Sequence, residues 1–346
     1  MHNLESRNIA TGFAFLHDEA GFAIGETPIA YSPSDTYGRA IAVGLLNTLR
    51  VSVIAIVVAT LLGTLVGVAR LSQNWLLARL AGFYVEVVRN TPLLLHLFFW
   101  YAVITQNMPH PRQAYDLLPG VFVSNRGITL PRLEGAGMDG LLGGLALAIV
   151  LLIVAQLCRR HSAICRLITR PTNALIVLLA LPALGWWMTG APIEWDVPRL
   201  AGFNFRGGLT LSPEFAALLG GLILYTTAFI AEVVRSGIQA VSRGQWEAAA
   251  SLGLPRRLVL RLVVLPQALR VIVPPMASQY LNITKNSSLA VAIGYPDLVS
   301  VVNTTLNQTG QAIEGILIIM AAYLTVSLSI SLLMNWYNRR IVLVER

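Results

Sequence analysis

Charged residues are scarce in this chain. Of its 346 residues only 12% are Asp, Glu, Lys or Arg, while 55% are hydrophobic. That is too little charge to cover the surface of a soluble globular protein of this length. The composition therefore excludes an ordinary soluble domain and favours an integral membrane protein.

Cysteine is also scarce, and lysine is almost absent. The two cysteines, Cys158 and Cys165, lie among arginines in a short gap between apolar runs, where we expect the cytoplasm to keep both thiols reduced. Together with His161 they make too small a ligand set for a metal, so we predict no metal site. The single lysine, Lys285, follows Thr284 rather than a glycine, which excludes an ordinary phosphate-binding loop for ATP. We therefore expect that this chain is not itself an ATPase.

The excess of positive charge has a topological explanation. A formal charge of +8 would favour nucleic acid as the partner of a soluble protein. Here, however, the arginines gather in the short gaps between apolar runs, as the positive-inside rule describes. We therefore predict no nucleic acid partner and place these gaps in the cytoplasm. The most basic gap holds Arg235, Arg243, Arg256, Arg257 and Arg261.

Apolar runs in the sequence predict about seven membrane helices, each needing about 20 residues to cross. A proline, Pro92, interrupts the second run, and three prolines interrupt the sixth, which is either a full span or a re-entrant one. Gly63 and Gly67 have the spacing of close helix packing. Seven crossings place every arginine cluster on one side, with the N-terminus outside and the C-terminus in the cytoplasm. The runs cover about 41–69, 83–104, 140–157, 173–188, 213–234, 262–281 and 313–337.

The predicted organisation follows from these runs. The fold class is all-α and integral to the inner membrane, with the long apolar runs inside one transmembrane domain. Segments without a long apolar run are tails or loops. The parts are an exposed periplasmic N-terminal tail (1–38), the transmembrane domain (39–338) with periplasmic loops (105–139 and 189–212) and a cytoplasmic loop (236–262), and a cytoplasmic C-terminal tail (339–346).

The cytoplasmic loop holds a short helix between two turns, Gly244 to Pro255. Its alanines favour helix, Gly253 suits the left-handed position after a helix, and Pro255 can open the next helix. Small side chains permit close approach of another protein, and Glu247 offers an acid to a cationic partner. We predict that this helix docks on a partner. The alternative is an ordinary alanine-rich helix at the membrane interface.

The spacing in and after this helix resembles the EAA loop of binding-protein-dependent ABC permeases. The order is Glu247-Ala248-Ala249, three residues, Gly253, nine residues, Val263, one residue and Leu265-Pro266. The family usually has isoleucine where Val263 stands, and a β-branched aliphatic side chain is kept. Three further stretches, 89–94, 266–270 and 285–289, are similar to polar amino acid permeases.

Other segments resemble one permease of a general L-amino acid importer. They are residues 31–39, the two runs within 140–188, and residues 293–297. The resemblance implies a methionine-importer-like type I ABC permease core with an inserted helix pair. Members of that group generally begin with a further span that residues 1–38 do not supply.

The same resemblance implies a mechanism and partners. The helix would be the coupling helix that seats in a cleft of an ATP-binding subunit, and the chain itself would bind no cofactor, because ATP and magnesium belong to that subunit. Two ATP-binding subunits, a second related permease in a heterodimer, and a periplasmic amino acid-binding protein would complete the assembly in the lipid bilayer. The implied coupling residues are Glu247, Ala248, Ala249, Gly253, Leu265 and Pro266.

A lysine near membrane depth marks a candidate substrate path, because intramembrane ionisable residues are usually functional. Lys285 could meet the carboxylate of an amino acid, or it could extend to the external interface instead. The candidate path residues are Asn282, Thr284, Lys285, Asn286, Ser287 and Ser288.

A repeated tetrapeptide, Glu-Val-Val-Arg, marks two cytoplasmic membrane boundaries. It places Glu86 one helical turn from Arg89, and Glu232 one turn from Arg235. These pairs are candidates for an inner gate, with interface anchoring as the simpler interpretation.

Two other function classes compete with a passive transport subunit. An ion-driven secondary amino acid transporter would need acids in the middle of its spans, and a membrane enzyme would need a nucleophile, a metal set or paired acids. Glu314 lies at the mouth of the last run, while Glu86 and Glu232 lie at boundaries. No metalloprotease helix motif or serine-hydrolase elbow is present in the sequence. The sequence favours a transport subunit whose energy comes from elsewhere.

Overall fold

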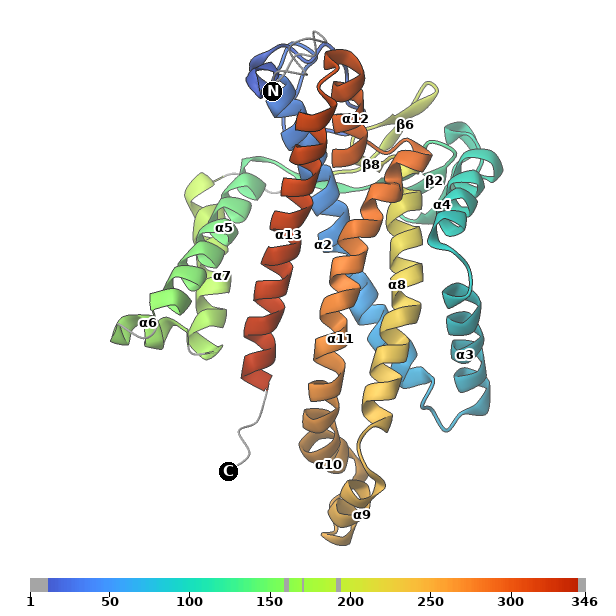
Figure 1. The fold of residues 1–346 in the computed structure, drawn as a ribbon, viewed down its shortest axis with the longest axis vertical. Coiled ribbons are helices and arrows are strands. Elements are labelled where there is room, and N and C mark those ends of the chain that lie inside the picture. The colour runs from blue at the N-terminus through green and yellow to red at the C-terminus, as the bar shows by residue number, and fades with distance from the viewer. Residues whose placement is uncertain (1–11, 159–161, 170, 191–193, 342–346) are drawn as a thin grey trace, which may run out of the picture. The chain divides into compact units, whose positions relative to one another are not determined.

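The computed structural model of the chain is shown in Figure 1. It describes residues 12–158, 162–169, 171–190 and 194–341. The chain divides into a core unit, made of Met1–Gln106 and Pro213–Arg346, and an inserted unit, Asn107–Ser212. Residues 342–346 of the predicted C-terminal tail and residues 1–11 of the predicted N-terminal tail lie outside the described residues.

Membrane-spanning helices dominate the described residues. Six are long and apolar enough to cross a bilayer, and a bent helix pair adds a seventh if its two parts count as one span. Helices satisfy their own backbone hydrogen bonds, as the hydrocarbon core requires. The predicted all-α membrane class is confirmed. The six are α2 (Tyr37–Ala69), α5 (Ala136–Leu157), α7 (Pro171–Thr189), α8 (Pro213–Gln239), the continuous stretch Arg256–Ile293, and α13 (Ala312–Ile341).

The second predicted span, 83–104, is not one straight helix, so that prediction is wrong in its geometry. Instead α3 (Trp75–Arg89) and α4 (Leu93–Ala102) meet at a bend of 103°, and α4 continues into a π-helical turn, η2 (Val103–Asn107). Pro92 stands at the break and has no N–H to bond back into α3. It also disfavours helical backbone at the residue before it. The proline therefore ends a helix where the sequence predicted a tolerated kink.

The sixth predicted span extends beyond 262–281 at both ends. The helical stretch runs for 38 residues without a break, and at about 1.5 Å per residue it reaches at most about 57 Å, against about 30 Å for the hydrocarbon core. Pro274 and Pro275 lie inside it and do not interrupt it. The stretch is long enough to span fully. Its parts are α10 (Arg256–Val259), η5 (Leu260–Val264), α11 (Leu265–Asn286) and η6 (Ser287–Ile293).

Glycines on α2 allow this helix to pack closely against α8. A Cβ on Gly63 would lie 2.6 Å from the Cβ of Ile230, and one on Gly67 would lie 2.7 Å from the carbonyl oxygen of Ala231. Neither distance is compatible with a real side chain, so the predicted packing role of both glycines is confirmed. A buried apolar cluster then continues from this contact towards α11. Its members are Ala59, Ile230, Val234, Val241, Ala249, Val259, Val264, Ala268, Ile272 and Met276.

Within the predicted exposed tail, residues 12–36 form a folded N-terminal segment. Phe15 is buried with Tyr37 and Val301, so the segment packs on α2 and on α12 (Leu298–Thr309). The backbone N–H of Gly12 donates to the carboxylate of Glu314 over 2.8 Å, which ties it to α13 as well. The segment therefore covers one end of the core unit.

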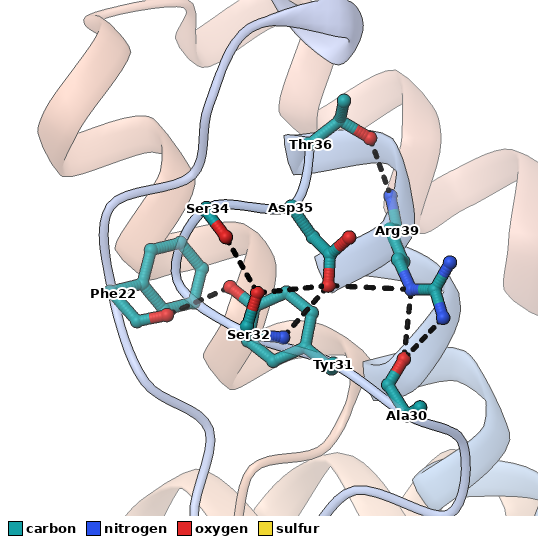
Figure 2. A network of polar contacts seen from close by, with 8 residues as sticks. All are labelled: Phe22, Ala30, Tyr31, Ser32, Ser34, Asp35, Thr36 and Arg39. Carbon is teal, nitrogen blue, oxygen red and sulfur yellow. Dashed lines mark hydrogen bonds and ion pairs between the residues drawn. The ribbon is translucent and has the colours of Figure 1, made fainter.

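A polar network fixes the last turn of this segment before α2 begins (Figure 2). The carboxylate of Asp35 accepts from the N–H of Ser32 over 2.8 Å and lies 3.5 Å from Arg39. Arg39 also donates from Nε to the carbonyl of Ala30 over 2.8 Å. Thr36 accepts from the N–H of Arg39 and so caps α2. The entry into the first span is thus held by local contacts.

In the inserted unit, α5 and α7 form the predicted helix pair, joined through a short α6 (Ala163–Ile168). Glycines again set the distance. A Cβ on Gly144 would lie 2.3 Å from the carbonyl oxygen of Leu181, and one on Gly140 would lie 2.3 Å from that of Gly185. The close packing of this pair therefore depends on small residues.

Short strands occupy the two segments that the sequence predicts as external loops. Among the described residues of the inserted unit they form one antiparallel sheet of order β1-β2-β3-β8 and two separate two-stranded pairs, β4-β5 and β6-β7. A short 3-10 turn, η3 (Pro111–Gln113), precedes them. The strands are β1 (Tyr115–Leu118), β2 (Val121–Ser124), β3 (Gly127–Leu130), β4 (Arg132–Glu134), β5 (Glu194–Asp196), β6 (Arg199–Ala201), β7 (Asn204–Arg206) and β8 (Leu209–Leu211).

Candidate functional site

The short helix that the sequence predicts after the fifth span is present as α9 (Arg243–Ser251), beyond the end of α8 and next to α10 (Figure 1). Two residues after its last turn, Gly253 adopts a φ of +71°, in the left-handed region that favours glycine. The N–H of Gly253 donates to the carbonyl of Ala250 over 2.9 Å. Because an isolated helix of this length is marginal in water, contacts with the rest of the chain must hold it.

Three contacts fasten the inner face of α9 to the core unit. Ala249 is only 4% exposed and belongs to the buried cluster shared by α8 and α11. Trp246 packs against the same cluster. The side-chain amide of Gln267, on α11, donates to the amide oxygen of Gln245 over 3.1 Å. α9 therefore packs on η5 and α10, and the contact between Gln245 and Gln267 ties it to α11.

The outer face of α9 is open for docking. Glu247, Ala248 and Ala250 are exposed, and Leu252 at the end of the helix is 80% exposed. A large apolar side chain held out by a structured turn is a typical anchor for a partner protein. Beside it lies a groove of about 490 Å³, lined by Trp246, Glu247, Ala250, Leu254, Arg256 and Val259.

The six predicted coupling residues occupy four different places in the structure. Glu247 and Ala248 lie on the outer face, and Gly253 forms the turn. Ala249, one of the predicted coupling residues, points inward, because one side of any surface helix must face the core. Leu265 and Pro266 stand apart, at the start of α11. Leu252, Arg256 and the Gln245–Gln267 contact were not among the predicted coupling residues.

A cluster of ion pairs joins three helices at the end of the core unit nearest α9. Arg235 donates two side-chain hydrogen bonds, of 2.5 and 3.1 Å, to the carboxylate of Glu232 on α8. It also contacts Arg70, at the end of α2, and lies 3.8 Å from Arg89, at the end of α3. We call these four residues the gate cluster. They are Arg70, Arg89, Glu232 and Arg235.

The gate cluster confirms one of the two predicted pairs and corrects the other. Glu232 and Arg235 form the expected ion pair. Among the described residues Glu86 forms none, because Arg89 turns to Glu232 instead. Arg70 joins the cluster from 162 residues away in sequence, and no local pattern could have shown that contact.

The six predicted path residues do not form one polar site. Thr284 and Ser287 are buried, and their hydroxyls donate to backbone carbonyls of their own helix. Ser288 does the same with the carbonyl of Lys285 over 2.7 Å. Asn282 and Lys285 are exposed three residues apart on α11 and so share one face. Asn286 is half-buried. A substrate contact on this helix is thus best sought at Asn282 and Lys285.

A buried acid, Asp297, precedes α12. Its side chain accepts from the N–H of Ser300 over 2.9 Å and caps the helix. The neighbouring backbone is held on α2, since Thr48 accepts from the N–H of Leu298 and Asn47 donates to the carbonyl of Pro296. Burial raises the pKa of the Asp297 carboxyl to about 6, despite the backbone N–H groups that favour its charged form.

No group of three or more His, Cys, Asp or Glu side chains that could hold a metal occurs in the part of the chain that the structure describes. Cys158 and Cys165 are free thiols, and His161 lies outside the described residues. The expected absence of a metal or cofactor of this chain stays a prediction.

Comparison with known proteins gives a consistent match. Residues 59–343 match the family model described as "Binding-protein-dependent transport system inner membrane component". The chain is 54% identical to the putative amino-acid ABC transporter permease protein YhdX of Escherichia coli K12, over 99% of this chain and 88% of that protein. It is 47% identical to the general L-amino acid transport system permease protein AapQ of Rhizobium johnstonii, over 99% and 87%.

A solved structure shows the same fold. The crystal structure of an amino acid ABC transporter with histidines superposes with a TM-score of 0.53 and 22% identity, covering 88% of this chain and 95% of that chain. The predicted type I permease architecture fits this likeness.

The gate cluster generates a stability prediction. Glu232→Gln removes the one carboxylate that faces three guanidinium groups, and we expect it to lower the free energy of unfolding by roughly 1–3 kcal/mol, as for hydrogen bonds to charged groups. Glu86→Gln removes the same charge from an exposed position and should be close to neutral. Thermal unfolding of the purified variants in detergent measures both. Equal melting temperatures for the two variants would contradict the geometry described for Glu232.

Burial of Asp297 generates a pH prediction. Because its pKa is about 6 in the folded chain and 3.8 ordinarily, the folded state holds the proton more tightly. The stability that this group contributes is therefore complete below about pH 4 and is lost as the pH rises through about 6. Asp297→Asn keeps a capping side chain and should abolish that loss, which amounts to at most roughly 3 kcal/mol.

The measurement is the melting temperature of parent and variant across about pH 4 to 7. The difference should move in favour of Asp297→Asn with rising pH and level off above the folded pKa. Asp116→Asn, at an exposed position of the inserted unit, controls for the loss of a carboxylate. A difference that does not depend on pH would show that Asp297 is not protonated by burial.

Proposed function

The chain belongs to the family of binding-protein-dependent transport system inner membrane components, and on that premise we propose that it is the permease subunit through which an ABC importer moves L-amino acids across the inner membrane. It is a multi-pass membrane protein and a transport subunit rather than an enzyme. The substrate class follows the names of the relatives, which are an amino-acid and a general L-amino acid permease.

The observation that best supports coupling is the two-sided construction of α9. Its inner residue Ala249 is buried with α8 and α11, while its outer face presents Glu247 and the exposed Leu252 beside a groove. A helix so placed can receive movement from one side and deliver it to the other. We infer that separate ATP-binding subunits, which bind ATP and magnesium, seat on this outer face.

The gate cluster suggests how this movement reaches the transport path. Glu232 lies on α8, the helix that leads to α9, and it holds the ends of α2 and α3 through Arg70 and Arg89. A shift of α8 therefore changes the distance between Glu232 and two guanidinium groups. Because ion pairs at a partly buried site are rearranged only at a cost, the cluster suits a two-state closure of the inner end. We propose that it is the inner gate in an alternating-access cycle.

Substrate contacts are proposed at the exposed face of α11 near its end. Lys285, the only lysine of the chain, lies three residues from Asn282 on that face. An ammonium and an amide can together bind the carboxylate of an amino acid. This assignment extends the substrate class to particular side chains and rests on their exposure and spacing.

Orientation and assembly complete the proposal. The arginines after α8 and at the end of α13 favour a cytoplasmic location for α9 and for the C-terminus, which leaves the N-terminal segment in the periplasm. The family premise implies two ATP-binding subunits, a second related permease as heterodimer partner, and a periplasmic amino acid-binding protein. The ion-driven alternative is not favoured, since the buried acids of the described chain, Asp297 and Glu314, are a helix cap and an acceptor for Gly12.

A substitution at Gly253 can test coupling without disturbing the packing of neighbouring side chains. No atom lies within 4 Å of a Cβ added there, so a substitution acts only through the left-handed backbone. Gly253→Val should strain the turn by about 1–2 kcal/mol, whereas Gly253→Asn suits that backbone far better. We expect Gly253→Val to lower uptake and substrate-stimulated ATP hydrolysis together, by roughly fivefold or more, and Gly253→Asn to keep most of both.

The assay is uptake and ATP hydrolysis by the reconstituted assembly, with co-purification of the ATP-binding subunits as the check on assembly. Uptake that continues without ATP would sink the ABC assignment and restore the ion-driven alternative. Equal activity of the two variants would show that the turn at Gly253 has no part in coupling.

A further inference from the structure

Beside the gate cluster lies a pocket of about 260 Å³. Its wall is formed by the end of α2, one face of α3 and the last turns of α8. We call it the arginine pocket. The residues that matter for its chemistry are Arg70, Arg79, Arg235, Glu86, Gly82 and Phe83.

Positive charge is in excess around this pocket. Three arginines line it, and Arg89 stands close by through its contact with Glu232. Against these four arginines stand two acids, Glu86 in the wall and Glu232 in the gate cluster, which leaves two positive charges uncompensated. Arg79 in particular is exposed and forms no ion pair among the described residues.

A guanidinium group presents a planar fork of donors that matches phosphate oxygens. We propose that the arginine pocket binds a phosphate-bearing anion, supplied either by the headgroup of an anionic phospholipid or by phosphate free in the cytoplasm. Its volume is below the ~300–1,000 Å³ typical of pockets for drug-sized ligands, as suits a group of this size.

The surroundings of the pocket suit a lipid. On α3, next to the pocket, Trp75, Leu76, Leu80 and Phe83 are all more than half exposed. An apolar helix face that ends in a cationic pocket can hold acyl chains and headgroup together. Basic pockets between transmembrane helices on the cytoplasmic side recognise anionic headgroups in this way.

Occupancy of this pocket would bear on coupling. Gln239, the last residue of α8, also lines it, and α9 begins only four residues later. Arg70 and Arg235 belong both to the pocket and to the gate cluster. An anion bound here competes with Glu232 for these guanidinium groups and so shifts the balance of the gate. This consequence for transport rests on the proposed function, whereas the binding itself does not.

Binding is measured on the purified importer in lipid nanodiscs. One arm compares phosphatidylcholine alone with phosphatidylcholine containing phosphatidylglycerol, and native mass spectrometry counts the phosphatidylglycerol molecules retained. The other arm titrates inorganic phosphate into phosphatidylcholine nanodiscs and follows binding by calorimetry. Uptake is recorded in parallel in closed vesicles of phosphatidylcholine that contain the same importer.

Two sets of variants test the pocket itself. Arg79→Gln should weaken binding about fivefold, the contribution of one basic residue near an anionic lipid surface. Arg339→Gln, an exposed arginine at the end of α13, makes the same charge change away from the pocket and should have no effect. Gly82 has open space at its Cβ, so Gly82→Glu adds an acid to the pocket without a clash, with Gly82→Gln as its neutral match.

The expected result is retention of phosphatidylglycerol that falls with Arg79→Gln and falls more with Gly82→Glu than with Gly82→Gln. Binding of inorganic phosphate with the same pattern, in the absence of bound phosphatidylglycerol, assigns the site to free phosphate. The proposal is overturned if neither source binds, or if Arg79→Gln and Arg339→Gln weaken binding equally. If the unmodified importer binds the anion as expected but shows no uptake in phosphatidylcholine, the result would instead count against the proposed transport role.

Discussion

Gly63 and Gly67 bring α2 so close to α8 that Ile230 and the backbone at Ala231 fill the space where side chains would otherwise stand. Lipid gives two apolar helices little reason to associate, so close packing of this kind is what holds them together. The rest of the core unit depends on this contact. It positions Glu232 against the ends of two other helices, and it anchors the helix from which α9 extends.

Coupling can be understood as a consequence of that arrangement. α9 is too short to be stable alone. It is held by Ala249, which belongs to the same buried cluster as residues of α8 and α11. Under the proposed function, a partner that pushes on the outer face moves the helices that pack against this cluster. Under the proposed function, the same movement changes the ion pairs of Glu232, which links the proposed docking surface to the proposed inner gate.

The sequence predicts most of the spans and the coupling helix. The features that it does not predict share one cause, which is that they depend on contacts between distant segments. The spans follow from uninterrupted apolar runs, and α9 with its turn at Gly253 follows from residues that act within a few positions of one another. Contacts between distant segments were missed, above all Arg70 with Glu232. Whether a membrane helix can continue through Pro92 depends on neighbouring helices that satisfy the freed backbone groups. The local sequence does not show whether such neighbours exist. The inward face of Ala249 was missed because three identical alanines give a helix no preferred side.

The most direct test of this account is the accessibility of the outer face of α9. With Cys158 and Cys165, the chain's two cysteines, replaced by serine, Ala250→Cys places one thiol in the docking groove, and Ser34→Cys places one on the exposed N-terminal segment. A membrane-impermeant maleimide should label Ala250→Cys from the cytoplasmic side alone, and the ATP-binding subunits should protect it, while Ser34→Cys should label from outside. Labelling of Ala250→Cys in intact cells, or equal labelling with and without those subunits, would contradict the account.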